Sequence, residues 1–180
     1  MAAASASASG HVLSYDGFDP DAEGLREAIC ALGNGVFVTR GACSWSRADG
    51  VHYPGTYLAG GYDRLTTRIA GRDVENEDLV NLPNWLPVTF RHGSGPWFGG
   101  GADHLAAYRL ELDVDAGVAA WRARLDHDGI DAVDWSERRA VHLADPRLAV
   151  QEVTFSVPDG ADPPTERITV RAGIDGSVKN

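Results

Sequence analysis

Carboxylates are the side chains of this sequence best suited to chemistry, since 26 Asp and Glu residues stand against 16 Lys and Arg. Hydrolysis by acid and base catalysis needs two carboxylates held at a defined separation, one of them protonated. The densest acidic groups are Glu75-Asn-Glu-Asp78 and Asp126-His-Asp128. Both stand beside predicted turns, where charged side chains are normally solvated. Spacing alone therefore predicts no catalytic pair, and we expect no catalytic residue.

Histidine and cysteine spacing gives no metal or nucleophile signature. The six histidines share no i,i+4 or short paired spacing. Cys30 and Cys43 form neither a CxxC pair nor a disulfide framework, so buried free thiols are expected. No G-x-S-x-G elbow or dinucleotide fingerprint occurs, and Gly99-Gly-Gly101 lacks the lysine and hydroxyl residue of a phosphate-binding loop. We predict no metal and no cofactor.

Composition narrows the class of protein. A net charge of −10 repels phosphate backbones, which argues against nucleic acid as a partner. No apolar run approaches the roughly 18 residues that cross a bilayer, which argues against a membrane partner. Residues 1–10 contain neither basic residues nor a hydrophobic stretch, unlike a signal peptide. The interpretation is a cytoplasmic protein with a flexible Ala/Ser-rich tail over residues 1–18.

The elements that position these side chains are mainly strands. Over residues 108–126, apolar side chains alternate with charged ones on both arms of a turn at Asp115-Ala-Gly117. Such alternation predicts a half-buried antiparallel hairpin. Its predicted core-facing residues are Tyr108, Leu110, Leu112, Val114, Trp121 and Leu125. Trp135 is expected at a strand edge.

Further strands are expected over residues 36–38, 57–62, 65–69, 79–82, 86–90, 141–143, 153–157 and 168–174, with turns such as Asp128-Gly129 between them. One short helix is predicted after Asp19-Pro20, with Leu25, Ile29 and Leu32 as its buried stripe and Gly33 at its end. An antiparallel sheet that exposes one face to water must bury its other face against a second layer. Residues 19–180 are therefore predicted to form a mainly β, antiparallel β-sandwich domain.

Five blocks in a fixed order resemble one protein family. They are Leu32-Gly-Asn-Gly-Val-Phe-Val-Thr-Arg-Gly41, Pro54-Gly-Thr-Tyr-Leu-Ala-Gly-Gly-Tyr-Asp63, Leu79-Val-Asn-Leu-Pro-Asn-Trp85, Leu110-Glu-Leu-Asp-Val-Asp-Ala-Gly117 and Ile174-Asp-Gly-Ser-Val-Lys-Asn180. Together they resemble the N-terminal region of glycoside hydrolase family 65. Thr39 and Asp115 depart from that pattern, where Gly and Arg are common.

The resemblance implies an architecture and a division of labour. Family 65 enzymes are phosphorylases and hydrolases of α-glucosyl disaccharides such as maltose, trehalose and kojibiose. They join an N-terminal sandwich of the galactose-mutarotase-like type to an (α/α)6 barrel that carries the catalytic residues. The chain is therefore expected to be an accessory domain that has no catalytic residues and contains only part of the sandwich. Its expected partners are the missing barrel, a second copy of itself and an α-glucosyl disaccharide.

Five residues of these blocks are candidates for substrate binding or for contact with the barrel: Arg40, Tyr57, Tyr62, Asn84 and Trp85. Aromatic rings beside glycine and proline offer faces for sugar stacking or for protein contact. The competing interpretations are a local hydrogen-bonding role for Arg40, core packing for the aromatics and a turn-fixing role for the asparagine.

Two other classes of function stay open. The chain could be a stand-alone carbohydrate-binding module. It could also be a mutarotase-like enzyme, which needs a histidine acid/base facing a glutamate. His104 and His142 are the candidates in the sequence for that histidine.

Overall fold

The computed structural model describes residues 5–6, 10–127, 130–161 and 166–178, so the turn predicted at Asp128-Gly129 lies outside the described residues. The elements in chain order are β1 (Ser5–Ala6), β2 (Val12–Asp16), α1 (Pro20–Ile29), β3 (Leu32–Gly33), β4 (Phe37–Thr39), β5 (Thr56–Ile69), β6 (Arg72–Asn81), β7 (Val88–His92), the 3-10 turn η1 (Ala102–His104), β8 (Leu105–Asp113), β9 (Val118–His127), β10 (Ile130–Val141), β11 (Ala149–Ser156) and β12 (Ile168–Ala172).

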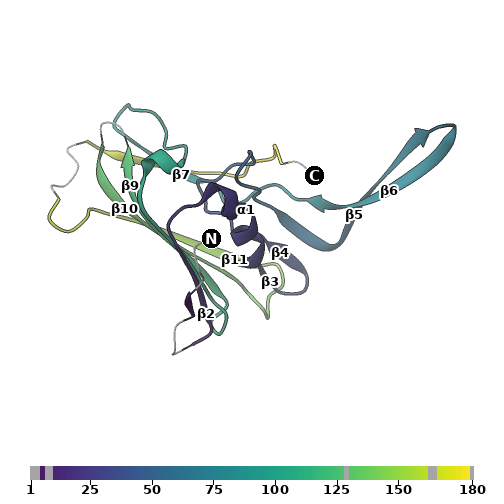
Figure 1. Ribbon diagram of the computed structural model, residues 1–180, viewed down its shortest axis with the longest axis horizontal. Coiled ribbons are helices and arrows are strands. Elements are labelled where there is room, and N and C mark those ends of the chain that lie inside the picture. Colours follow the sequence, from purple (N-terminus) through teal and green to yellow (C-terminus); the bar gives the residue numbers. More distant parts are fainter. Residues whose placement is uncertain (1–4, 7–9, 128–129, 162–165, 179–180) are drawn as a thin grey trace.

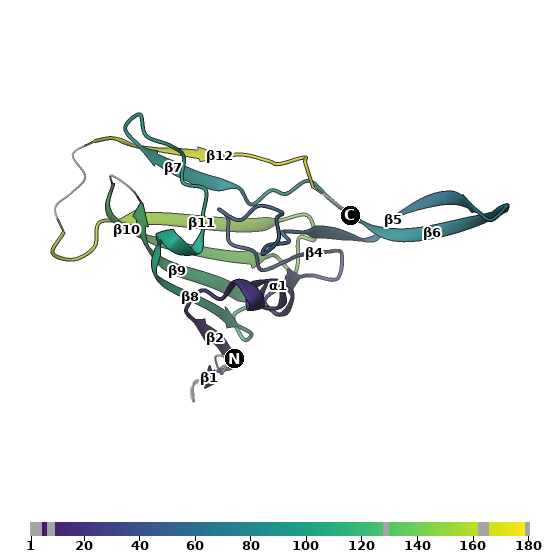
Figure 2. The same cartoon turned by 45° about the horizontal axis from the view of Figure 1, so that its top comes forward.

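The strands form three antiparallel sheets, which confirms the mainly β sandwich (Figure 1). A six-stranded sheet has the order β1-β2-β8-β9-β10-β11, a two-stranded sheet pairs β12 with β7, and a four-stranded sheet has the order β3-β4-β5-β6. Figure 2 shows β7 and β12 lying over the strands of the six-stranded sheet. The six-stranded sheet includes Val12–Asp16, residues that were expected to belong to the tail that precedes the domain.

The core lies between the six-stranded sheet and the segments that cover it. Trp121 and Trp135 project from the sheet and are almost fully buried, while Phe90 comes from β7 and Phe98 from the loop after it. Phe90 stacks on Phe98 at 5.2 Å between ring centroids, and Trp135 meets Phe155 edge-on at 4.8 Å. Trp135 therefore belongs to the centre of the core and not to a strand edge as predicted, because β10 lies between β9 and β11.

The predicted hairpin is confirmed as β8 and β9, with Leu110 opposite Trp121 in the register. Tyr108, Leu110, Trp121 and Leu125 are buried, and Leu112 packs against the core from its margin. Val114 is an exception, since it is 60% exposed. β8 ends at Asp113, so the alternation stops one residue before Val114.

Helix α1 begins as expected but ends at Ile29, earlier than predicted, and turns the opposite face inward. Asp19 caps its N-terminus by accepting a hydrogen bond from the Asp21 backbone N–H at 3.2 Å. The predicted stripe is wrong: Leu25 is 65% and Ile29 44% exposed, while Glu23, Arg26 and Glu27 are buried. Gly33, predicted to end the helix, instead belongs to β3.

β5 and β6 form a long hairpin that projects away from the two other sheets (Figures 1 and 2). β5 is one continuous strand with an irregularity between Tyr57 and Tyr62, where two separate strands were predicted. Its partner β6 includes Glu75-Asn-Glu-Asp78, a segment predicted to lie beside a turn. The charges are exposed as expected, but they lie on a strand, because the turn is instead the two-residue Ala70-Gly71.

Candidate functional site

An apolar groove lies at the base of the β5–β6 hairpin and contains two predicted site residues, Tyr57 and Tyr62. Its volume is about 260 Å³. It is lined by Gly33, Gly35, Val36, Phe37, Val38, Tyr57, Leu58, Ala59, Tyr62 and Leu79. Tyr62 is 56% exposed, and no charged or amide side chain lines the groove. A sugar subsite needs convergent hydrogen-bonding groups beside its aromatic rings, so this chemistry favours contact with a protein surface.

Tyr57 lines that groove, and its ring lies against Gly55. A Cβ on Gly55 would lie 2.6 Å from the Tyr57 hydroxyl, so only glycine permits this approach. Burial, with a hydrogen bond to Tyr53, raises the pKa of the Tyr57 hydroxyl to about 12. The phenol therefore stays protonated near neutral pH and cannot act as a base there.

Arg40 serves the local structure. It donates from Nη2 to the Gly24 carbonyl at 2.8 Å and lies 3.8 Å from Glu27 Oε2. Its guanidinium carbon lies 5.4 Å from the centroid of the Tyr53 ring. These contacts join the segment after β4 to helix α1. Arg40 is thus near Tyr57 through Tyr53, but it does not line the apolar groove.

Asn84 and Trp85 lie in a different place from the apolar groove. Asn84 pairs through its backbone with Asp175 in both directions at 2.8 Å, and its Oδ1 accepts from the Leu86 N–H at 3.1 Å. The Trp85 ring lies 5.9 Å from the Arg139 guanidinium. Asn84 therefore holds the local backbone through its side chain, in line with the competing interpretation, and joins two family-like blocks that are far apart in sequence. The five predicted residues do not converge on one site.

Sequence analysis missed a buried ionic network beneath α1. Arg26 Nη1 lies 2.7 Å from Glu23 Oε1 and donates to the Gly17 carbonyl at 2.7 Å. The Tyr108 hydroxyl donates to Glu23 Oε2 at 3.1 Å. Burial raises the pKa of Glu23, and the neighbouring Arg26 and Tyr108 offset only part of that rise. The available signal was the i,i+3 spacing of Glu23 and Arg26, which coincides with helical periodicity.

A second part of the same network pairs His52 with Glu27. The ring Nδ1 of His52 lies 2.8 Å from Glu27 Oε1, and the Tyr53 N–H donates to Glu27 Oε2 at 2.9 Å. Burial alone lowers the pKa of His52, but the Glu27 hydrogen bond and the carboxylates of Glu27, Asp49 and Glu23 together raise it. This His–Glu pair involves neither His104 nor His142, the histidines predicted for a mutarotase-like site.

A third cluster of buried polar side chains joins β10 to the segment after β4. Glu137 Oε2 accepts hydrogen bonds from the Ser44 hydroxyl at 2.7 Å, the Ser44 N–H at 3.0 Å and the Cys43 thiol at 3.2 Å. Glu137 Oε1 pairs with Arg139, whose Nη2 also donates to the Ala42 carbonyl at 2.9 Å. Both charged residues are at most 1% exposed. With every oxygen of Glu137 engaged, the group is structural.

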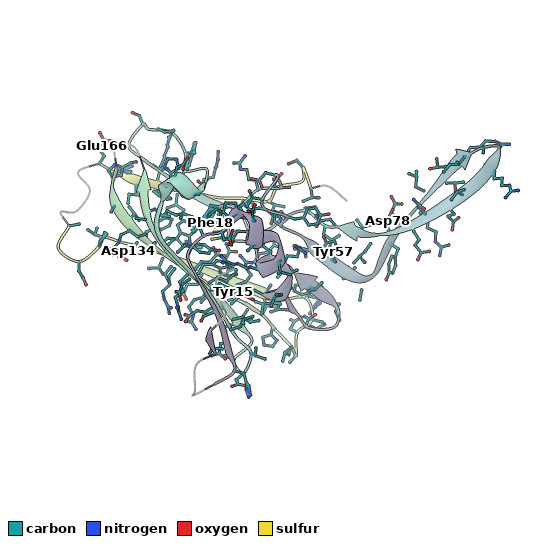
Figure 3. The ribbon with its side chains drawn as sticks, in the orientation of Figure 1. Tyr15, Phe18, Tyr57, Asp78, Asp134 and Glu166 are labelled. Atoms are coloured by element: carbon teal, nitrogen blue, oxygen red, sulfur yellow. The ribbon has the colours of Figure 1, made fainter. Side chains whose placement is uncertain are left out.

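A larger groove, about 610 Å³, runs across β8, β9 and β10, and two carboxylates, those of Asp16 and Asp134, line it. Arg109 Nη1 lies 2.5 Å from Asp16 Oδ1, and Arg124 Nε lies 2.8 Å from Asp134 Oδ1. The hydrogen bond and charge of Arg124 lower the pKa of Asp134. Figure 3 shows Asp134 on the side of the six-stranded sheet, away from Tyr57 and the hairpin. With Arg124 beside it, Asp134 is not arranged as a proton donor.

A smaller groove, about 360 Å³, lies between the segment after β4 and the β7–β12 pair. Arg47, Arg171 and Asp175 contribute charged groups to it, beside the buried Trp45. The Ser46 hydroxyl, which also lines it, is buried without a hydrogen-bond partner among the described residues. This groove has the polarity that the apolar groove lacks.

Neither metal ligation nor membrane insertion finds support in the described residues. No group of three or more His, Cys, Asp or Glu side chains there could hold a metal ion. In the part of the chain that the structure describes, no helix has the length and apolarity needed to cross a bilayer. Cys30 and Cys43 are buried and free, as predicted.

Comparison with curated proteins finds long relatives. An uncharacterized glycosyl hydrolase of Mycobacterium tuberculosis, found in two strains, is 36% identical over 168 residues, which are 93% of this chain and 12% of the relative. Trehalose 6-phosphate phosphorylase of Lactococcus lactis subsp. lactis is 51% identical over 59 residues, which are 33% of this chain and 8% of that enzyme. The chain therefore spans only a small part of the relatives that it matches.

A solved structure assigned as a kojibiose phosphorylase, from the human microbiome, has the same fold over 80% of this chain and 19% of its own, with a TM-score of 0.67 and 20% identity. The family model described as "Glycosyl hydrolase family 65, N-terminal domain" matches residues 13–180. That match covers the sandwich from Leu13 onward, the hairpin and all five sequence blocks. The chain belongs to glycosyl hydrolase family 65 and represents its N-terminal domain.

Proposed function

We propose that this chain is a non-catalytic accessory domain of a phosphorylase or hydrolase that acts on α-glucosyl disaccharides. The family membership and the names of the relatives support this class of enzyme. Catalysis then belongs to a separate domain, the (α/α)6 barrel, which the β-sandwich supports.

The observation that supports the proposal is the direction in which the pKa of the carboxylates is shifted. A general acid for glycoside cleavage needs a raised pKa, so that it still holds its proton near neutral pH. Asp134 has the opposite arrangement, because Arg124 lowers the pKa of its carboxyl. Glu23 does have a raised pKa, but it is 2% exposed and lines none of the three grooves described above. Neither of these two carboxylates thus combines access with the raised pKa that catalysis requires.

The accessory role that we propose is contact with the barrel through the apolar groove. Tyr57 and Tyr62 line that groove together with Val36, Leu58 and Leu79, and the last four are 39–56% exposed. Exposed apolar patches of this kind mark contact surfaces. Arg40, Asn84 and Trp85 act behind it, by holding the segments around the hairpin in place.

A turnover assay tests the proposal. The chain is incubated with maltose, trehalose, kojibiose or trehalose 6-phosphate, with and without inorganic phosphate, and glucose and glucose phosphate are measured. We expect no product above a blank that lacks protein. Turnover that survives further purification and is lost in Asp134→Asn would overturn the proposal.

A stand-alone carbohydrate-binding module is the second candidate function, favoured by the unpartnered Ser46 hydroxyl in the polar groove beside Arg47 and Arg171. Against it, Trp45 is 5% exposed and offers no open ring for stacking. Calorimetric titration with maltose distinguishes the two functions. We expect no binding at micromolar concentrations, and micromolar affinity that is lost in Arg171→Ala would favour the module.

We further propose a cytoplasmic location. The two free buried thiols support it, because reducing compartments keep cysteines unpaired. The protein is extracted from cells under acid quench, unfolded and treated with a thiol-labelling reagent. Both cysteines should be labelled, because both thiols are free. A disulfide between Cys30 and Cys43 would contradict this location.

A further inference from the structure

Positive charge gathers at the polar groove, although the whole chain has a net charge of −10. Arg47 reaches the groove from the segment after β4 and Arg171 from β12, so the two guanidinium groups approach it from separate parts of the chain. Asp175 is the one carboxylate among the residues that line it. The groove volume of about 360 Å³ lies within the range of roughly 300–1,000 Å³ that is usual for small-molecule sites.

The two arginines of the groove are not neutralised within the described part of the chain. The ion pairs there involve other arginines, and no described residue forms a hydrogen bond with the side chain of Arg47 or Arg171. A guanidinium keeps its proton at any physiological pH. Both groups therefore bring a full charge and a set of unused N–H donors to the same hollow.

The Trp97 ring holds Arg171 in place. The guanidinium carbon of Arg171 lies 4.3 Å from the centroid of that ring, and the guanidinium carbon of Arg91, from β7, lies 4.9 Å from the same centroid. Stacking on an indole engages the flat face of a guanidinium. The N–H groups lie in the plane of the guanidinium and stay free to donate to an oxyanion.

Ser46 adds an unused hydroxyl to the groove. It lines the groove, is 3% exposed, and its Oγ has no hydrogen-bond partner among the described residues. Native structures keep few unpaired buried polar groups, and each needs an explanation. Because rotation about the Cα–Cβ bond moves the Oγ, the hydroxyl can donate to an atom that enters the groove.

Asp175 is the lining residue that opposes an anion. Its Oδ1 accepts hydrogen bonds from the Ser177 N–H at 2.9 Å and from the Ser177 hydroxyl at 2.6 Å. These hydrogen bonds, with a smaller contribution from the charge of Arg47, lower the pKa of Asp175, so the carboxyl is ionised at neutral pH. Three guanidinium groups, those of Arg47, Arg91 and Arg171, thus stand against one carboxylate.

We propose that the polar groove binds a phosphate dianion, either as inorganic phosphate or as the phosphoryl group of a small ester. Arg47 and Arg171 donate to it from the two sides of the groove, and the Ser46 hydroxyl donates to a third oxygen. A tetrahedral phosphate presents oxygens in several directions, whereas a carboxylate presents two in one plane. Donors from separate segments therefore suit phosphate better. The inference does not rest on the proposed accessory role.

The groove is open to water, so the affinity is modest. We expect a dissociation constant on the order of 0.1–1 mM for inorganic phosphate at low ionic strength. It should rise with salt, because exposed charges are screened over about 8–10 Å. Titration calorimetry of the whole chain with inorganic phosphate measures it, and glucose serves as the neutral probe that should not bind. Absence of phosphate binding up to about 10 mM overturns the proposal.

Glucose 6-phosphate distinguishes the two sources of the phosphate group. A dissociation constant at least about tenfold lower than that of inorganic phosphate assigns the groove to a sugar phosphate, because the sugar must then add contacts of its own. An equal or higher dissociation constant assigns the groove to free phosphate.

Removal of the groove charges tests the donors. Arg47→Gln and Arg171→Gln should each raise the dissociation constant at least about fivefold. Arg167→Gln is the matched control, since Arg167 is an exposed arginine just before β12 that does not line the groove. Four residues of extended chain place it about 13 Å from Arg171, beyond the screening length, so its effect should stay within about twofold. Unchanged affinity in both groove variants overturns the proposal.

Two further substitutions separate binding from folding. Ser46→Ala should weaken phosphate binding about threefold or more, while the thermal unfolding midpoint stays the same or rises, because the hydroxyl has no partner in the free protein. A lowered midpoint would assign the hydroxyl to the fold and overturn its place in the site.

Asp175→Asn removes the opposing charge, and its amide oxygen can still accept from Ser177. It should strengthen phosphate binding at least about threefold, a gain that misfolding does not produce. Weaker binding by a variant of unchanged stability would overturn the proposal. None of these outcomes depends on turnover, so a failure here leaves the accessory role as it stands.

Discussion

Buried charges define this domain at the scale of single residues. Glu137 and Arg139 project from β10 into the core side of the six-stranded sheet, and Arg139 lies 4.5 Å from the Trp121 ring. Removing one member of such a pair leaves an unpaired charge that water cannot reach. The neighbouring residue Arg138 points outward and forms only an exposed pair with Glu152 at 3.8 Å.

These two environments predict a large difference between adjacent arginines. Arg139→Met should lower the free energy of unfolding by about 3–5 kcal/mol, because Glu137 loses its partner. Arg138→Met should change it by less than about 1 kcal/mol. Urea denaturation of both variants measures the difference. Equal effects would mean that Glu137 is paired some other way.

His52 makes stability depend on pH. Its pKa in the folded state is raised above the ordinary value of 6.5, so the folded protein holds more protons than the unfolded chain in the interval between the two values. This contribution to stability is complete below about pH 6.5 and is lost as pH rises through the folded pKa.

Glu27→Gln should therefore lower the pKa of His52 and flatten that loss. Nuclear magnetic resonance of the His52 ring gives its pKa in both proteins, and urea midpoints across the neutral range give the stability. An unchanged His52 pKa in the variant would show that Glu27 does not hold the proton on the ring.

At the scale of elements, the β8–β9 hairpin shows how far alternation predicts burial. Leu110 is fully buried opposite Trp121, whereas Val114 follows the end of β8 and is exposed. The alternation of apolar and charged residues in the sequence continues through both Leu110 and Val114. The strand ends between them, at Asp113, so only Leu110 is covered by the sheet.

Truncation of these two residues should separate them clearly. Leu110→Ala should lower the free energy of unfolding by about 2–5 kcal/mol, because it leaves a cavity against the tryptophan. Val114→Ala should change it by less than about 0.5 kcal/mol. Thermal unfolding followed by circular dichroism provides both values, and a large loss for Val114 would refute the strand end at Asp113.

At the scale of the whole molecule, the apolar groove lies at the base of the β5–β6 hairpin, which projects from the two other sheets. The groove includes Tyr62, which lies opposite Leu79 on the face of the hairpin that also carries the pair Arg64–Glu77.

Tyr62 reports contact with the barrel. In the chain alone, its half-exposed phenol should react readily with tetranitromethane, and the buried Tyr108 should not. In a polypeptide that also contains the barrel, modification of Tyr62 should slow by about tenfold or more if the groove is covered. Mass spectrometry locates the modified ring, and Tyr62→Phe confirms the assignment. Unchanged reactivity would place the barrel elsewhere.

The sequence alone determined the features that depend on local order. Alternation at 108–113 and 118–125 specified a hairpin and the residues that face the core, because side chains alternate sides along any strand. The signals at Asp19 and Pro20 specified where a helix begins, because the cap is a contact between near neighbours. The five blocks specified the family for the same reason, since each is a short continuous segment.

Only the tertiary structure decided which surfaces meet. Helix α1 has two stripes at helical spacing, Leu25 with Ile29 and Glu23 with Arg26 and Glu27, and its polar stripe is buried because Tyr108, His52 and the Gly17 carbonyl supply partners. Likewise, Glu137 is inward-facing because Ser44, more than ninety residues earlier, donates to it. Sequence proximity carries no information about such distant partners, and the free energy of a buried polar group depends on them.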